Sequence, residues 1–129
     1  MALSRLAQEF ADEIRLHDWS DAPYRWDRAG HRRSMDSKAP DETLTARETD
    51  FLKKNVVSVV SQVLLHRDSN LDIWEFAEAC GLDSRTASGR SRDGSYRAAL
   101  RFDLDENALP PGKYLSDVRR PGKEGESPQ

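Results

Sequence analysis

The chain has 129 residues, of which 36% are hydrophobic and 33% charged, and its formal net charge is −3. This length fits one domain, because a single core usually needs about 100 to 150 residues. No apolar run approaches the roughly 18 residues of a membrane span, and Glu9, Asp12 and Glu13 stand where a signal peptide would be apolar. We therefore expect a mainly α, cytoplasmic domain over residues 1–118, with no membrane contact and a disordered tail at 119–129.

The first predicted element is an amphipathic helix over residues 3–17. Leu3, Leu6, Phe10 and Ile14 recur at three- and four-residue spacing, which is the period of an α-helix. We expect this stripe to pack on the core.

Residues 18–44 lose this periodicity and contain Pro23, Gly30 and Pro40, which predicts a long loop with at most one irregular helical turn. A loop of this length in a compact domain is usually functional or ordered by a partner. Its first half interleaves aromatic residues with arginines: Trp19, Tyr24 and Trp26 with Arg25, Arg28, Arg32 and Arg33.

This composition allows three interpretations. Aromatic rings stack on unpaired bases while arginines follow phosphates, which suits nucleic acid. The same residue types dominate hot spots in protein interfaces. Alternatively, the aromatic residues clamp the loop onto the core, and the arginines pair with the acidic stretch from Asp68 to Ser84.

The second predicted helix begins at Ala46, because Thr45 and Glu48 have the spacing of a capping box. It is expected to run to His66 with a broad apolar face, formed by Leu52, Val56, Val59, Val60, Val63 and Leu64 and widened by Phe51, Val57 and Leu65. This apolar face is wider than a helix in one small domain needs for packing on its own core. Part of the helix is therefore expected to face a second copy of the chain, forming a homodimer.

A helix-turn-helix-like segment is predicted at residues 72–90, with a helix over 71–80 and a shorter one after Asp83. Ala77, Gly81, Leu82 and Asp83 match that motif in order and spacing, since it needs a small residue, a glycine turn, an apolar residue and a cap. The expected DNA contacts are Ser84, Arg85, Ser88 and Arg90 at base edges, and Arg92 and Arg97 at phosphates. A plain helical hairpin would show the same pattern.

Beyond this segment, Leu100, Phe102 and Leu104 alternate with charged residues, which predicts a short strand or hairpin near residues 98–116. The single cysteine, Cys80, is expected to be a buried small hydrophobe. The loop aspartates and the three histidines lack any recognised ligand spacing, so we predict no metal, no cofactor and no catalytic residues.

The leading functional prediction is a small non-enzymatic DNA-binding regulator. It would use residues 72–90 to read DNA, with Arg25, Arg28, Arg32 and Arg33 on the backbone. The alternative is a protein-interaction module or inhibitor that contacts a protein partner through Trp19, Tyr24 and Trp26 and does not bind nucleic acid.

Overall fold

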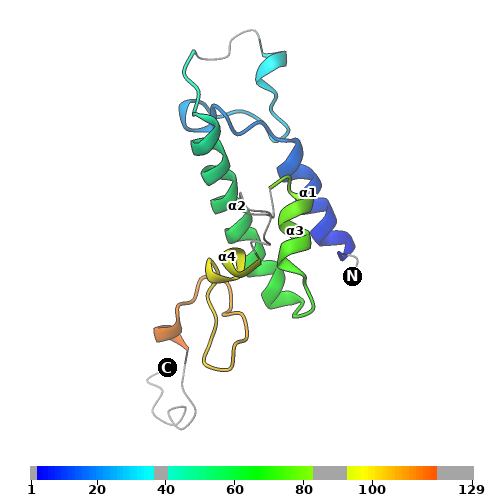
Figure 1. Ribbon diagram of the computed structural model, residues 1–129, viewed down its shortest axis with the longest axis vertical. Coiled ribbons are helices and arrows are strands. Elements are labelled where there is room, and N and C mark those ends of the chain that lie inside the picture. Colours follow the sequence, from blue (N-terminus) through cyan, green and yellow to red (C-terminus); the bar gives the residue numbers. More distant parts are fainter. Residues whose placement is uncertain (1–2, 37–40, 83–92, 119–129) are drawn as a thin grey trace.

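The computed structural model describes residues 3–36, 41–82 and 93–118. These residues form four α-helices: α1 (Arg5–Leu16), α2 (Ala46–Arg67), α3 (Ile73–Ala79) and α4 (Asp93–Ala98) (Figure 1). Short 3-10 turns occur at Ala22–Tyr24, Arg33–Met35 and Leu115–Asp117. The mainly α prediction is confirmed, and within the described ranges no segment forms a β-strand. None of the helices described is both long and apolar enough to cross a membrane.

Helix α1 packs on α3 through small side chains. The Ser4 hydroxyl caps the helix by accepting the Ala7 N–H at 3.1 Å, and the buried row is Ala7, Ala11 and Ile14. Leu6 is 54% exposed and Phe10 is also exposed, so the prediction that they join the core is wrong. Adjacent helix positions point about 100° apart, and the alanine row allows a closer approach of α3 than the larger side chains would.

Helix α2 begins with the predicted capping box. The Glu48 N–H donates to Thr45 Oγ1 at 3.1 Å, and the Thr45 N–H donates to the Glu48 carboxylate at 2.9 Å. The buried face contains Val57, Leu64 and Leu65, whereas Val59 is 70% exposed. The broad valine face is therefore only partly used in this chain, and binding of a second copy there stays a prediction.

Helix α3 ends in the turn that the sequence predicts. Gly81 has φ 95°, the left-handed conformation that favours glycine. Its N–H donates to the Glu78 carbonyl at 2.9 Å, and the Leu82 N–H donates to the Ala77 carbonyl at 3.0 Å, which together make a Schellman motif. The following residues lie outside the described ranges, including the predicted base contacts Ser84, Arg85, Ser88 and Arg90 and the predicted phosphate contact Arg92.

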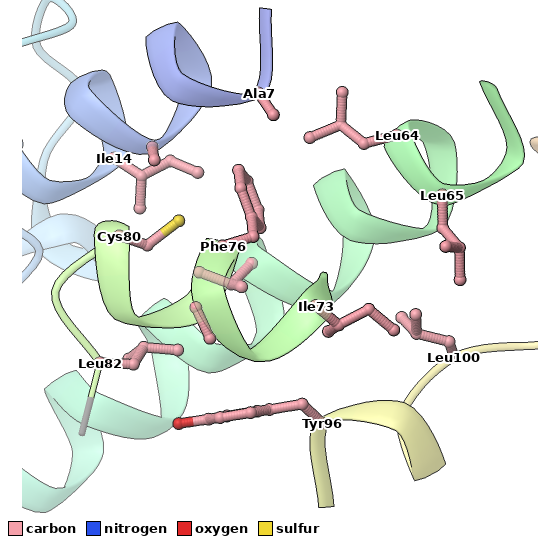
Figure 2. Packing of buried hydrophobic residues seen from close by; sticks show 13 residues of the cluster. Ala7, Ile14, Leu64, Leu65, Ile73, Phe76, Cys80, Leu82, Tyr96 and Leu100 are labelled. Carbon is pink, nitrogen blue, oxygen red and sulfur yellow. The ribbon is translucent and has the colours of Figure 1, made fainter. Parts of the chain in front are cut away.

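The core lies between the four helices. Figure 2 shows the Phe76 ring of α3 directed toward the space between Ala7 of α1 and Leu64 of α2, with Tyr96 and Leu100 closing the opposite side. Cys80 is fully buried, as predicted, and this burial raises the pKa of its thiol to about 12. The cysteine is therefore a packing residue.

One buried glutamine attaches the C-terminal segment to α2. The side-chain amide of Gln62 donates to the carbonyls of Arg101 and Leu109, both at 3.0 Å, and its oxygen accepts the Arg101 N–H at 2.7 Å. The predicted hairpin is limited to one antiparallel bridge, between Phe102 and Ala108. The Asp103 carboxylate accepts two N–H groups of the intervening turn, which closes the pairing after a single bridge.

Candidate interaction surface

The loop between α1 and α2 forms one end of the molecule, far from α4 and the C-terminal segment (Figure 1). Backbone hydrogen bonds connect distant parts of the loop. The Asp18 N–H donates to the His31 carbonyl at 2.9 Å, and the Leu44 N–H donates to the Ser20 carbonyl at 2.6 Å. The Trp19 indole N–H also donates to the carbonyl of Ile14, at the end of α1. The described part of the loop is thus ordered by contacts within this chain.

A buried aspartate–histidine pair forms the centre of the loop. Asp21 and His31 are both buried, and His31 Nε2 lies 3.1 Å from Asp21 Oδ1. The other ring nitrogen, Nδ1, lies 3.0 Å from Asp27 Oδ2, while the Arg33 guanidinium donates to Asp21 Oδ2 at 3.3 Å. Buried polar groups are tolerated when they are hydrogen-bonded, as these are. These contacts fix the imidazole at both nitrogens.

A second ion-pair group lies beside this centre. The Arg25 guanidinium donates to the carboxylates of Asp27, at 2.7 Å, and of Asp36. Asp27, His31 and Asp36 bring potential ligand atoms within 4.8 Å of one another, as a metal site would. Because Arg25 contacts both carboxylates, the chain itself supplies positive charge at this place, and ion pairing accounts for the cluster.

The protonation of the surrounding groups agrees with this bonding. Burial, followed by the nearby His31, lowers the pKa of His17, whose Nδ1 accepts the Gly30 N–H at 3.1 Å. His17 is therefore a neutral acceptor rather than a cation at the end of α1. Burial raises the pKa of Asp18, but hydrogen bonds from Ser20 and from the Arg33 N–H outweigh it, so the net shift is downward.

Several other side chains of the loop are exposed to solvent. Trp26 is 99% exposed, Met35 is 77% exposed, and Tyr24 is also exposed. Arg28 has a side chain that is 90% exposed and lies 4.0 Å from Asp27, at the limit of an ion pair, and Arg32 is exposed too. These five exposed residues of the loop, Tyr24, Trp26, Arg28, Arg32 and Met35, are called the loop surface below, and the exposed Asp41 and Glu42 belong to the same loop.

The loop surface includes only some of the residues predicted from sequence. Trp19 is half-buried, with its ring 4.4 Å from that of His17, and acts as a clamp. Arg25 and Arg33 are engaged by carboxylates of the loop, so their predicted pairing with the stretch from Asp68 to Ser84 is wrong. Arg97 lies on α4, with its guanidinium 4.3 Å from the Phe102 ring centre. The structure therefore does not bring Arg97 to the loop surface.

Sequence reasoning missed Met35 and Asp21. A methionine in a polar, aperiodic loop is a sign of an exposed contact, because an apolar side chain there has no helical face to join. Asp21 is one of several loop aspartates, and nothing in its spacing distinguishes the one that becomes buried.

The charged groups border a hollow of about 180 Å³ whose lining includes His17, Asp21, Trp26 and His31. Pockets for small molecules usually enclose about 300–1,000 Å³, so this hollow is small for a typical substrate. Its polar groups mainly bond one another, and this arrangement orders the loop.

No protein-family model matches the chain, and no curated protein or solved structure is significantly similar to it. Function is therefore inferred from the geometry of the loop.

Proposed function

We propose that the protein is a non-enzymatic interaction module that binds a protein partner through the loop surface. The observation that carries this proposal is the 99% exposure of Trp26 on a loop ordered by the buried Asp21, which contacts His31 and forms an ion pair with Arg33. A tryptophan buries about 150–250 Å² in an interface. At about 25 cal/mol per Å², that burial stabilises a complex by roughly 4–6 kcal/mol before the costs of association.

The bonding within the loop favours tight binding as well. Association costs about 0.5–1.5 kcal/mol for each long side chain that must be ordered, and more for a mobile loop. Here the Asp21–His31 and Arg25–Asp36 contacts order the backbone around Trp26 before any partner arrives. The loop surface therefore combines an aromatic anchor with a preorganised frame, which is typical of interaction hot spots.

The test is affinity capture with the full chain as bait, followed by titration of the purified captured protein in a calorimeter. Trp26→Ala is expected to weaken binding by at least about 30-fold, the effect of a hot-spot residue worth about 2 kcal/mol. Leu104→Ala is the matched control, because Leu104 is also a large exposed apolar residue but lies in the segment after α4, outside the loop. If Trp26→Ala and Leu104→Ala retain the same proteins with the same affinity, the proposal is wrong.

DNA binding through residues 72–90 is the second candidate function. The Schellman turn at Gly81 favours it, because the helix-turn-helix motif needs a sharp turn at this position. Fluorescence anisotropy with random duplex DNA at two salt concentrations tests it, since binding through phosphates weakens steeply with salt. Salt-sensitive binding that is lost on Arg85→Ala with Arg90→Ala would support DNA binding, and absence of binding at low salt would exclude it.

A further inference from the structure

Two hydrogen bonds close the first part of the loop on itself, where the residues that follow α1 meet the chain again. The His17 ring accepts the Gly30 N–H at Nδ1, at 3.1 Å, and the Asp18 N–H donates to the His31 carbonyl at 2.9 Å. These two neighbouring contacts are called the neck of the loop below. The segment that the neck encloses contains Trp26, so the position of this residue depends on the neck being closed.

Only one of the two contacts depends on the protonation of a side chain. A backbone carbonyl accepts a hydrogen bond at any pH, whereas the imidazole of His17 accepts at Nδ1 only while that nitrogen carries no proton. The imidazolium has N–H donors at both nitrogens, so protonation replaces the hydrogen bond to Gly30 by two N–H groups that face each other. The closed neck therefore requires a neutral His17.

The charged groups around the ring offer the imidazolium another partner. The Glu13 carboxylate lies beside the contact that protonation breaks, because its Oε2 is 4.0 Å from the position that a Cβ on Gly30 would occupy. The titratable groups that face His17 are Glu13 of α1 and Asp18, Asp21 and His31 of the loop, and Arg25 and Asp27 line the same hollow. The nearby carboxylates favour the proton, but burial, followed by the nearby His31, outweighs them and lowers the pKa of His17. The ring is therefore neutral in neutral solution and is protonated in acid.

The other titratable groups of the neck keep their contacts in the same pH range. Burial raises the pKa of Asp18, but hydrogen bonds to this carboxylate lower it further, so it stays ionised while His17 takes up its proton. His31 lies between the carboxylates of Asp21 and Asp27, one at each ring nitrogen, so both N–H groups of a protonated His31 would have acceptors. His17 is thus the group of the neck whose protonation breaks a contact.

We propose that His17 is a pH-sensitive switch of the loop: its neutral ring closes the neck, and its protonation releases Gly30 and loosens the chain around Trp26. The switch goes beyond the proposed function, because it is a property of the loop alone and needs no partner. Since the folded chain binds this proton less readily than the unfolded chain, the contact is fully present above pH 6.5 and is lost as the pH falls through the pKa of His17.

The experiment follows the isotope-labelled full chain by nuclear magnetic resonance between about pH 7.5 and about pH 4.5, a range that spans ordinary and lowered histidine pKa values. The ring signals of the three histidines show which of them takes up a proton. Hydrogen exchange at the Gly30 amide, corrected for the intrinsic effect of pH on the exchange rate, reports the neck. Exchange at Val57, in the middle of α2, reports the helices.

The variant is His17→Asn, whose side-chain oxygen stands where Nδ1 stood and accepts a hydrogen bond without titrating in this range. The matched control is His66→Asn, which replaces an exposed histidine of α2 outside the loop. We expect the protection of the Gly30 amide to fall by about fivefold or more in the wild type and in the control, which is the effect of one lost hydrogen bond. The fall follows the His17 ring signal, with a midpoint below pH 6.5, whereas His17→Asn keeps Gly30 protected and Val57 is unchanged in all three chains.

Constant protection of Gly30 while the His17 ring titrates would overturn the switch, as would an equal loss in His17→Asn or the absence of protection in neutral solution. A simultaneous loss at Gly30 and Val57 would show that the whole chain unfolds in acid, which also counts against it. If His17→Asn does not fold, the wild-type titration decides, because the protection of Gly30 must follow the ring signal of His17 rather than that of His31. None of these outcomes affects capture through Trp26, which tests the proposed function separately.

Discussion

Replacing Asp21 by asparagine tests whether the buried ion pairs hold the loop. The substitution keeps the shape of the side chain and removes its charge, which leaves the buried His31 and the partly buried Arg33 without their shared carboxylate. Breaking a buried ion pair by removing one partner costs about 3–5 kcal/mol. Against a total stability of about 5–15 kcal/mol, this is a large fraction. For a chain of this size, it lowers the Tm by about 12–20 °C.

Two measurements separate loop order from global stability. Thermal unfolding followed by far-ultraviolet circular dichroism reports the helices. Hydrogen exchange at the amides of Asp18 and Leu44 reports the loop, because these two groups donate to His31 and Ser20 within it. We expect Asp21→Asn to accelerate exchange at both amides and to lower the free energy of unfolding.

The matched control is Asp12→Asn, which removes a carboxylate from an exposed pair with Arg15. Exposed pairs of this kind contribute about 0–1 kcal/mol, so the control is expected to behave like wild type. If Asp21→Asn also leaves the Tm and the two exchange rates unchanged, the buried ion pairs do not order the loop.

Further predictions concern Gly112 in the C-terminal segment, Gly81 after α3, the buried Cys80, and His17 at the end of α1. Gly112→Ala is expected to cost about 1–2 kcal/mol, because φ is 77° there and a Cβ meets nothing within 4 Å. Gly81→Ala is expected to cost more in urea unfolding, since φ is 95° there and its Cβ would also lie 3.2 Å from Arg15 Cγ, on the stem of that side chain; equal costs would contradict the close approach. Burial raises the pKa of the Cys80 thiol to about 12, so a thiol reagent should label it only on unfolding, and rapid labelling of the native chain would refute this. Burial lowers the pKa of His17 below its ordinary 6.5, so the folded chain binds its proton less readily than the unfolded chain. Its contribution to stability is present above pH 6.5 and is lost as the pH falls. His17→Gln should therefore reduce the fall in unfolding free energy between about pH 7.5 and pH 5.5, and an unchanged fall would count against the assignment.

The features that sequence reasoning located well are local ones. The capping box of Thr45 and Glu48 and the turn at Gly81 each depend on residues a few positions apart, whose side chains and backbone meet whenever the helix forms. Periodicity also located α1 and α2 to within a few residues, because a helix of 12 or 22 residues repeats its pattern several times.

The faces of these helices were harder to predict. Leu6 and Phe10 are more hydrophobic than Ala7 and Ala11, yet the alanines are buried because α3 packs closely against them. Which face of α1 is buried depends on how closely α3 packs against it. The hydrophobic periodicity of α1 alone contains no information on the partner helix.

The loop surface was predicted in composition but not in arrangement. The interleaved aromatic residues and arginines identified the segment, whereas the pairing of Arg25 with Asp36 depends on how the chain folds back after Gly30, which has φ 84°. Which arginines form ion pairs and which stay exposed is thus determined by the three-dimensional path of the chain.

The self-contained bonding of the loop has a consequence for how it forms. His31 contacts Asp27 and Asp21 at separations of 4 and 10 residues, and Arg33 reaches Asp18 at 15. Contacts of such low sequence separation close small loops, which form quickly and need few long-range partners. The frame around Trp26 is therefore encoded almost entirely between the last turn of α1 and the first turn of α2. The loop segment could therefore be grafted between two helices of another protein, because its structure depends little on the core formed by the other helices.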